Sequence, residues 1–217
     1  LPLFESFGID SEIEKLMRPK AWLKSGAYLI IEKTEAMVVI DVNSGKFVGK
    51  KLHEENSLKI NLEAAREVAR QLRLRDLSGL VVIDFIDMTE DRHRNAVLAK
   101  LHEALAKDPA QTQVGGFTFL GLVQLSRRRT RESLVQVMCS RCHHCTGTGM
   151  IKTPETICME ILRALAAEGD GLEHPQGTQD GHYVVAGNAS VIERLLDEEA
   201  LLFKALTAQL SSEVRLR

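Results

Sequence analysis

The sequence contains few aromatic residues and no long apolar run. Aromatic residues make up 5% of the 217 positions, so a broad platform for stacking nucleic-acid bases is not expected. The longest unbroken apolar stretches, such as Leu80 to Ile83, are far shorter than the ~20 residues that a membrane helix needs. No signal peptide is visible, and the chain begins with Leu1 rather than Met. We therefore expect no membrane span, and we expect the chain to be a piece of a longer protein.

Charge of neither sign dominates the chain. There are 28 basic and 30 acidic residues, and 44% of all residues are hydrophobic. These values are typical of globular proteins and exclude wholesale disorder, collagen and a disulfide-dense scaffold. One stretch departs from the balance, because residues 111–152 contain six Lys or Arg and a single acid, Glu132. Such a basic stretch permits a polyanionic partner without requiring one.

Hydrophobic periodicity predicts strands that alternate with helices. Asn61 would be the N-cap of the first helix, and alternation of this kind is typical of an α/β layer. The predicted strands are Tyr28–Glu32, Ala36–Asn43, Leu80–Ile86, Phe117–Leu125 and Tyr183–Ala186. The predicted helices are Asn61–Asp76, Thr89–Lys107, Pro154–Ala167 and Ser190–Leu210, with a loop at 169–181. A boundary is expected near residue 139, followed by a small module.

Two aspartates each follow an apolar strand directly. Asp41 and Asp87 would meet in the ligand crevice at the strand ends if the two strands are neighbours. Facing carboxylates repel unless a cation lies between them, and Mg²⁺ prefers such hard oxygen ligands. Asn43 follows on the same side as Asp41 and could orient a ligand or a water. Asp84 points to the opposite face from Asp87 if strict alternation continues, and is the weaker candidate.

A structural interpretation of the same residues stays open. Strand-end aspartates commonly make turn bonds or cap the next helix, so Asp41, Asn43 and Asp87 could serve the backbone alone.

Three of the four cysteines lie within seven residues, which favours a metal site over loop-closing disulfides in a reducing, cytoplasmic protein. Cys142 and Cys145 form a C-x-x-C pair followed by Gly147 and Gly149, a pattern typical of a zinc knuckle. A structural Zn²⁺ needs four ligands. Either Cys139 with His143 or His144 completes the site, or two chains each donate one cysteine pair. The remaining cysteine, Cys158, lies in a helical pattern and is expected to be a buried apolar residue.

A basic run directly follows a predicted strand. Its arginines could bind phosphates in bidentate fashion, or the run could be a solvated loop. Arg127, nearest to the strand end, is the one expected to lie beside the acidic edge. The candidate RNA-binding residues are Arg127, Arg128, Arg129 and Arg131.

Together these segments resemble the ribonuclease E/G family of bacterial endoribonucleases. The resemblance covers roughly residues 1–165 and fades beyond them; residues 153–158 look closer to the ribonuclease G branch. The residues that carry it are Ile40 to Ser44, Asn61 to Ala65, Arg70 to Leu77, Val82 to Met88, Cys142 to Gly149 and Thr153 to Cys158.

The resemblance implies an α/β fold with a DNase I-like mixed sheet flanked by helices. The implied parts are a catalytic subdomain at 1–138, a zinc-binding link at 139–152 and a small, helix-rich dimerisation domain at 153–217. In this family the positions of Asp41 and Asp87 hold a catalytic Mg²⁺, that of Asn43 supports them, and that of Arg127 helps to act on the phosphate. The pair Cys142 and Cys145 would share a structural Zn²⁺ with a partner subunit, giving a homodimer or higher oligomer.

The implied activity is Mg²⁺-dependent hydrolysis of single-stranded RNA to 5′-phosphate and 3′-hydroxyl ends, in maturation of ribosomal RNA and turnover of messages. Two departures from the family pattern matter. His143 replaces the usual proline and Cys139 is additional, so the chain could build its own zinc site. The RNA-binding N-terminal half of the family is also not in this sequence, so weak RNA capture is expected. The alternatives are a non-catalytic, zinc-stapled RNA-binding or scaffold module, and another phosphodiesterase on the same fold.

Overall fold

The computed structural model of the chain describes residues 2–45, 53–169, 182–210 and 213–217. The chain divides into two compact units, Leu1–Ser140 and Arg141–Arg217. Within the described residues, no helix combines the length and the apolar character that crossing a membrane requires.

The first unit is built on a mixed six-stranded sheet. Its strands lie in the order β1-β2-β3-β4-β6-β5. The central pair β3 and β4 is parallel, and the other neighbours are antiparallel. This confirms the predicted α/β class. The strands are β1 (Lys20–Trp22), β2 (Tyr28–Lys33), β3 (Met37–Asn43), β4 (Gly79–Asp84), β5 (Thr112–Phe117) and β6 (Leu122–Arg127).

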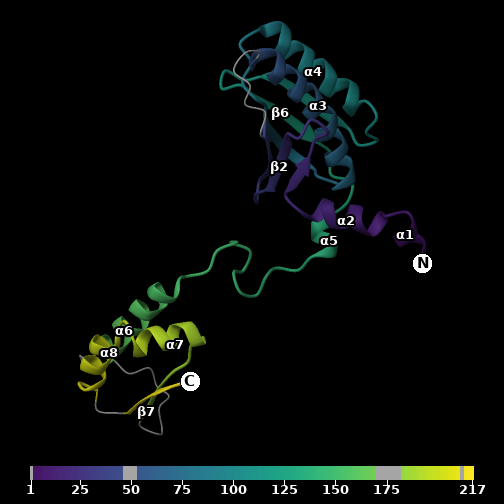
Figure 1. Cartoon of the computed structure of the whole chain (residues 1–217). Coiled ribbons are helices and arrows are strands. Elements are labelled where there is room, and N and C mark those ends of the chain that lie inside the picture. Colours follow the sequence, from purple (N-terminus) through teal and green to yellow (C-terminus); the bar gives the residue numbers. More distant parts are fainter. Residues whose placement is uncertain (1, 46–52, 170–181, 211–212) are drawn as a thin grey trace. The chain divides into compact units, whose positions relative to one another are not determined.

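Two long helices, α3 (His53–Leu74) and α4 (Asp91–Leu105), pack together against one face of this sheet (Figure 1). Alternate strand residues such as Val38, Ile40 and Ile83 point into the core that the helices cover. The opposite face stays partly exposed, and it carries Asp41 and Asn43 in alternation with those buried residues. The first unit also contains the short helices α1 (Leu3–Ser6), α2 (Ile9–Met17) and α5 (Leu134–Met138).

The second unit is a small domain with its own core. Its elements are α6 (Pro154–Gly169), β7 (His182–Val185), α7 (Ala189–Leu196), α8 (Ala200–Thr207) and β8 (Glu213–Leu216). Strands β7 and β8 pair in parallel. Cys158 is fully buried there with Leu162 and Leu195, as its helical pattern predicted.

Three expectations about elements are wrong. Phe117–Leu125 is not one strand, because a turn at 118–121 with Gly121 in the left-handed region separates β5 from β6. Ser190–Leu210 is not one helix, since the backbone of Asp197 leaves the helical region after α7. Asn61 is not an N-cap but lies inside α3, which begins at His53. The predicted loop at 169–181 lies almost wholly outside the described residues.

Candidate functional site

Asp41 and Asp84 lie directly opposite each other on the two parallel central strands. Each ends or nearly ends its strand, and opposed residues of neighbouring strands share one face of a sheet. This face is the one opposite α3 and α4, where Asp41 is half-buried and Asp84 is exposed. The structure therefore brings Asp84, the weaker candidate from the sequence, next to Asp41.

Asp87 lies in the segment that follows β4, because the strand ends at Asp84 rather than at Ile86. It is exposed and close enough to Asp84 for the two charges to interact. Across from it, a side chain at Gly121 would lie 3.9 Å from Oδ1 of Asp87, which places the β5–β6 turn beside this acid. The predicted pair of Asp41 and Asp87 is thus part of a wider group of three aspartates.

The electrostatics of this group are those of crowded negative charge. Partial burial, followed by the charges of Asp41 and then Asp87, raises the pKa of Asp84 above its ordinary value. Repulsion of this kind is relieved when a cation binds between the carboxylates. Asn43 donates from Nδ2 to Oδ2 of Asp41 at 2.7 Å, which restrains the Asp41 carboxylate. The donor set therefore fits a hard divalent cation, for which one or two carboxylates suffice.

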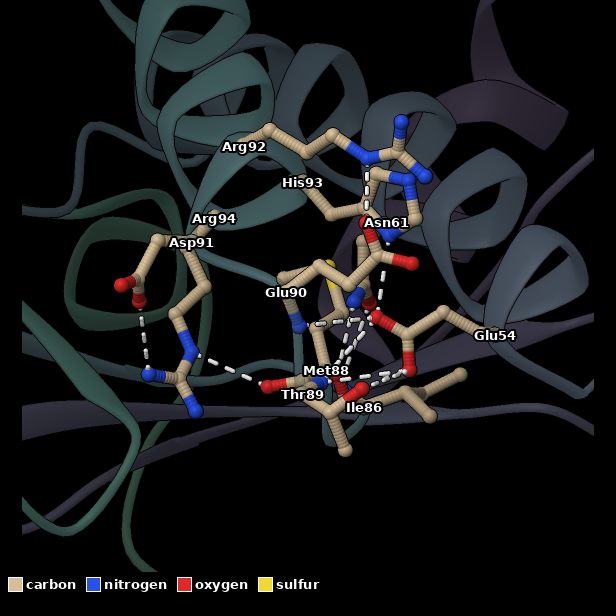
Figure 2. A network of polar contacts seen from close by, with 10 residues as sticks. All are labelled: Glu54, Asn61, Ile86, Met88, Thr89, Glu90, Asp91, Arg92, His93 and Arg94. Carbon is tan, nitrogen blue, oxygen red and sulfur yellow. Dashed lines mark hydrogen bonds and ion pairs between the residues drawn. The ribbon is translucent and has the colours of Figure 1, made fainter.

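Polar contacts from the helices hold the segment that carries these acids. The side chain of Asn61, fully buried on α3, accepts from the amide of Ile86 at 3.1 Å and donates to its carbonyl at 2.8 Å. Arg94 on α4 donates to the carbonyl of Met88 at 3.0 Å. Asn61 is 25 residues from Ile86, whereas Arg94 is only six residues from Met88. Together these contacts fix the backbone between Asp84 and the start of α4 (Figure 2).

Glu54 is the third anchor of this segment. Its carboxylate accepts from the amides of Thr89 and Glu90 and from the Thr89 hydroxyl at 3.0–3.2 Å. It also accepts from Nδ1 of His93 at 2.9 Å, so that nitrogen carries the proton. Hydrogen bonds from His93, Thr89 and Glu90 lower the pKa of Glu54 to about 2. Glu54 therefore caps α4, whose own N-cap residue offers no side-chain bond.

Among the described residues, only Glu54, Glu90 and His93 bring three potential metal-binding atoms within 4.8 Å of one another. The Glu54 carboxylate there is already occupied by the donors that it caps (Figure 2). The sheet-end aspartates Asp41, Asp84 and Asp87 lie further apart than these three residues. Among the described residues, however, fewer hydrogen-bond donors compete with a metal ion for their carboxylate oxygens. The sequence offered no signal for the Glu54 anchor, since its partners lie 35 or more residues away.

Arg127 does not lie beside the acids, and that expectation is wrong. It pairs with Gly79 at the start of β4, whereas Asp84 pairs with Leu122 at the other end of β6. Five residues of extended chain separate the two positions by about 17 Å. The Arg127 side chain is only 4% exposed.

The Arg127 guanidinium is committed to structural partners. It donates to both oxygens of Asp108 at 2.8 and 3.1 Å, to Asp76 at 2.8 Å and to the carbonyl of Leu77 at 3.0 Å. Arg131 also donates to Asp76. Burial alone would raise the pKa of Asp76 and of Asp108, but these arginine contacts outweigh burial and lower both. Of the predicted RNA-binding arginines, Arg128 and Arg129 are exposed and make no ion pair within the described residues.

The C-x-x-C turn folds as the glycines predicted. Thr146, Gly147 and Gly149 adopt positive φ values of 50°, 93° and 73°. Amides of Gly147 and Gly149, followed by the Cys142 thiol, donate to the Cys145 sulfur and lower its pKa. The turn thus presents two sulfurs together, with the backbone folded around one of them. Cys142, His143 and His144 are exposed, and Cys139 in the first unit contacts the sulfur of Met17 at 3.8 Å.

The model of one protein family, the ribonuclease E/G family, matches residues 1–130. Ribonuclease G of Haemophilus influenzae is 45% identical over 199 residues, which are 92% of this chain and 39% of that protein. Ribonuclease G of Escherichia coli is 43% identical over 199 residues, 92% of this chain and 40% of that protein. Ribonuclease E of Escherichia coli is 39% identical over 206 residues, 95% of this chain and 19% of that protein. The chain spans about two fifths of the length of the ribonuclease G relatives.

Proposed function

Because this chain belongs to the ribonuclease E/G family, we propose that it forms the catalytic part of an endoribonuclease. It would hydrolyse single-stranded RNA with Mg²⁺ and leave 5′-phosphate and 3′-hydroxyl ends. The observation that carries this proposal is the opposition of Asp41 and Asp84 across the parallel strands, with Asp87 beside them. Maturation of ribosomal RNA and turnover of messages are the corresponding processes.

Asp41 and Asp84 would hold the ion, and Asp87 adds a third negative charge to the same edge. A divalent ion there would polarise a phosphate oxygen and make a water molecule more acidic. The residues of the chain supply the arrangement. Asn43 holds the Asp41 carboxylate in one orientation through its 2.7 Å hydrogen bond. Its own amide oxygen, which accepts no hydrogen bond from the described residues, would orient a water.

A substrate can reach the acids because α3 and α4 cover only the other face of the sheet. The acids lie on the face opposite α3 and α4, so a single strand can reach them without displacing the core. Arg127 has no part in this proposal, since its guanidinium is buried among Asp76 and Asp108. Arg128 and Arg129 remain candidates for contacts with phosphates outside the reacting group.

The turn that contains Cys142 and Cys145 would link two subunits through a shared zinc ion. Cys142 and Cys145 supply two sulfurs, and a structural Zn²⁺ needs four ligands. A second chain that donates the same pair would complete the site and join two subunits, as the family resemblance implies.

The deciding experiment is an RNA cleavage assay, with and without Mg²⁺, on this chain and on a longer protein that contains it. Asp41→Asn and Asp84→Asn should each remove cleavage without loss of fold, and Asp10→Asn on α2 is the matched control. Cleavage that survives either substitution in the longer protein would refute the assignment. Magnesium-independent RNA binding with no cleavage would favour the non-catalytic module, and cleavage of DNA oligomers alone would favour another phosphodiesterase.

A further inference from the structure

An aromatic pair lies on the same sheet face as the candidate catalytic residues, in line with one of them. Trp22 on β1 is directly opposite Tyr28 on β2, and Tyr28 is directly opposite Asn43 on β3. Cross-strand partners share a face, so the three side chains form one row. Neighbouring strands lie ~4.8 Å apart, which puts Trp22 about 10 Å from Asn43.

The rings of Trp22 and Tyr28 contact each other on the sheet surface, and Trp22 is not buried in a core. Their centroids are 5.3 Å apart with an interplanar angle of 63°. Trp22 is 64% exposed, although it stands on a strand whose neighbour Ala21 is buried on the opposite face. A large exposed aromatic side chain on a sheet next to a polar reaction site is the arrangement on which nucleobases stack.

Lys20 gives this pair a positive charge. Its ammonium lies 4.0 Å from the centroid of the Trp22 ring and 3.6 Å from that of Tyr28. Within the described ranges it forms no ion pair. Lys20 belongs to the next row, opposite Ile30, which is opposite Asp41. A cation held by two rings can move to a phosphate and leave a ring face to a base.

We propose that Trp22 and Tyr28, with Lys20, form a stacking subsite for a nucleobase of single-stranded RNA beside the sheet-end aspartates. This subsite rests on the function proposed above, and it specifies where a part of the RNA substrate binds. Asp41 lies two residues along β3 from Asn43, so two strand spacings across and two residues along place Trp22 about 12 Å from Asp41. At a rise of about 3.4 Å per stacked nucleotide, this is on the order of three to four nucleotides. The base is therefore bound within about four nucleotides of the cleaved phosphate, and Lys20 pairs with a phosphate of the same stretch.

The chain contains a single tryptophan, so its intrinsic fluorescence reports on Trp22 alone. The test titrates this chain, in EDTA, with a ten-nucleotide single-stranded RNA and with an abasic oligomer of the same length. Fluorescence anisotropy of labelled oligomers measures binding in parallel. We expect the RNA to quench Trp22 and the abasic oligomer to leave the emission unchanged. Unquenched emission at RNA concentrations where anisotropy reports full binding, or no binding at all, overturns the subsite.

Variants separate stacking from general charge attraction. Trp22→Ala should weaken RNA binding roughly 5- to 100-fold, the range found for base–aromatic stacking, and Trp22→Phe should restore most of it. Phe7→Ala, which removes an exposed aromatic ring from the N-terminal segment, is the control and should change binding less than twofold. An equal loss in Phe7→Ala and Trp22→Ala refutes the subsite.

The two proposals fail in different ways. Quenching by RNA without Mg²⁺-dependent cleavage in the longer protein would leave the subsite standing and refute the hydrolase. Cleavage whose KM is the same in Trp22→Ala and in the parent would leave the hydrolase standing and refute the subsite. An abasic scan along a cleaved RNA should raise KM at one or two positions within about four nucleotides of the cut, and Trp22→Ala should abolish that position dependence.

Discussion

Asp41 and Asp84 face each other across the parallel pair β3 and β4, on the sheet face opposite the two long helices. Their positions are set by the register of the sheet, and within the described ranges neither carboxylate forms an ion pair with a basic side chain. A site that brings like charges together lowers the stability of the fold, and this cost is accepted where the site serves a function. The energetic cost of this pair is therefore a measurable property of the proposed site.

Replacing Asp84 with Asn should remove RNA cleavage and at the same time stabilise the fold. The neighbouring charges of Asp41 and Asp87 act against a charged Asp84, so a neutral amide relieves the repulsion. In EDTA we expect the melting temperature of Asp84→Asn to rise by about 1–3 °C. Cleavage should fall about 100-fold or more, since metal-assisted stabilisation amounts to several kcal/mol.

Asp87→Asn is the comparison that ranks the two acids. Because Asp87 lies beyond the end of β4, its substitution should reduce cleavage less than that of Asp84. A larger loss in Asp87→Asn than in Asp84→Asn would mean that the register-paired residues are not the principal ligands.

The choice between Asp84 and Asp87 shows where the sequence was insufficient. The apolar run Leu80–Ile86 predicted the strand correctly in place and type, but the strand ends at Asp84. Alternation was therefore extended past the end of the strand, where it no longer applies, so it could not rank Asp84 against Asp87. The hydrophobic pattern could not show that Phe85 lies outside the strand, because buried apolar residues occur both in strands and in the segments that follow them.

Strand direction explains the error at Arg127. The residues after a strand were expected at the acidic edge, but β6 is antiparallel to β4, so its carboxyl end lies at the opposite end of the sheet. The strand β1 could not be predicted either, because three residues are too few for a periodic pattern. The row formed by Trp22, Tyr28 and Asn43 exists only through that strand.

Arg127→Ala should destabilise the first unit and leave the chemistry unaffected. Removal of one partner from a buried ionic cluster costs about 3 kcal/mol or more. Here it would remove the ion pair of Asp108 and leave Asp76 with Arg131. Arg127→Lys should recover only part, because a single ammonium cannot replace the bidentate contact with Asp108. Urea denaturation measures the loss, and cleavage per folded molecule should stay within about twofold. A large drop in cleavage at unchanged stability would restore Arg127 to a catalytic role.

The Glu54 anchor predicts a particular loss of stability in acid. Its pKa is lowered from 4.5 to about 2 by hydrogen bonds from His93, Thr89 and Glu90, so the folded state favours the charged form. The stabilisation is therefore complete above pH 4.5 and is lost as the pH falls towards 2. Thermal melts of the parent and of Glu54→Gln should differ at pH 7 and converge as the pH falls from 4.5 towards 2.

Glu54→Ala tests the same hydrogen bonds without a change of pH. It removes the acceptor for two amides at the start of α4, and we expect the melting temperature to fall by about 2–6 °C. Glu55→Ala, one residue further along α3 and exposed, is the matched control. Equal melting temperatures for the two variants would show that the cap contributes nothing to stability.

The cysteine turn leads to a prediction about stoichiometry. Two sulfurs per chain are half of the ligands that a structural Zn²⁺ requires, so a site shared between subunits contains about half an ion per chain, and a site completed within one chain contains about one. Elemental analysis of the purified protein, together with its mass in solution, distinguishes these cases. We expect half an ion, and we expect Cys142→Ser and Cys145→Ser to lose both the zinc and the dimer. Cys139→Ser should retain both, because the thiol of Cys139 contacts Met17 in the first unit. One zinc per monomeric chain, lost in Cys139→Ser, would instead establish a local site.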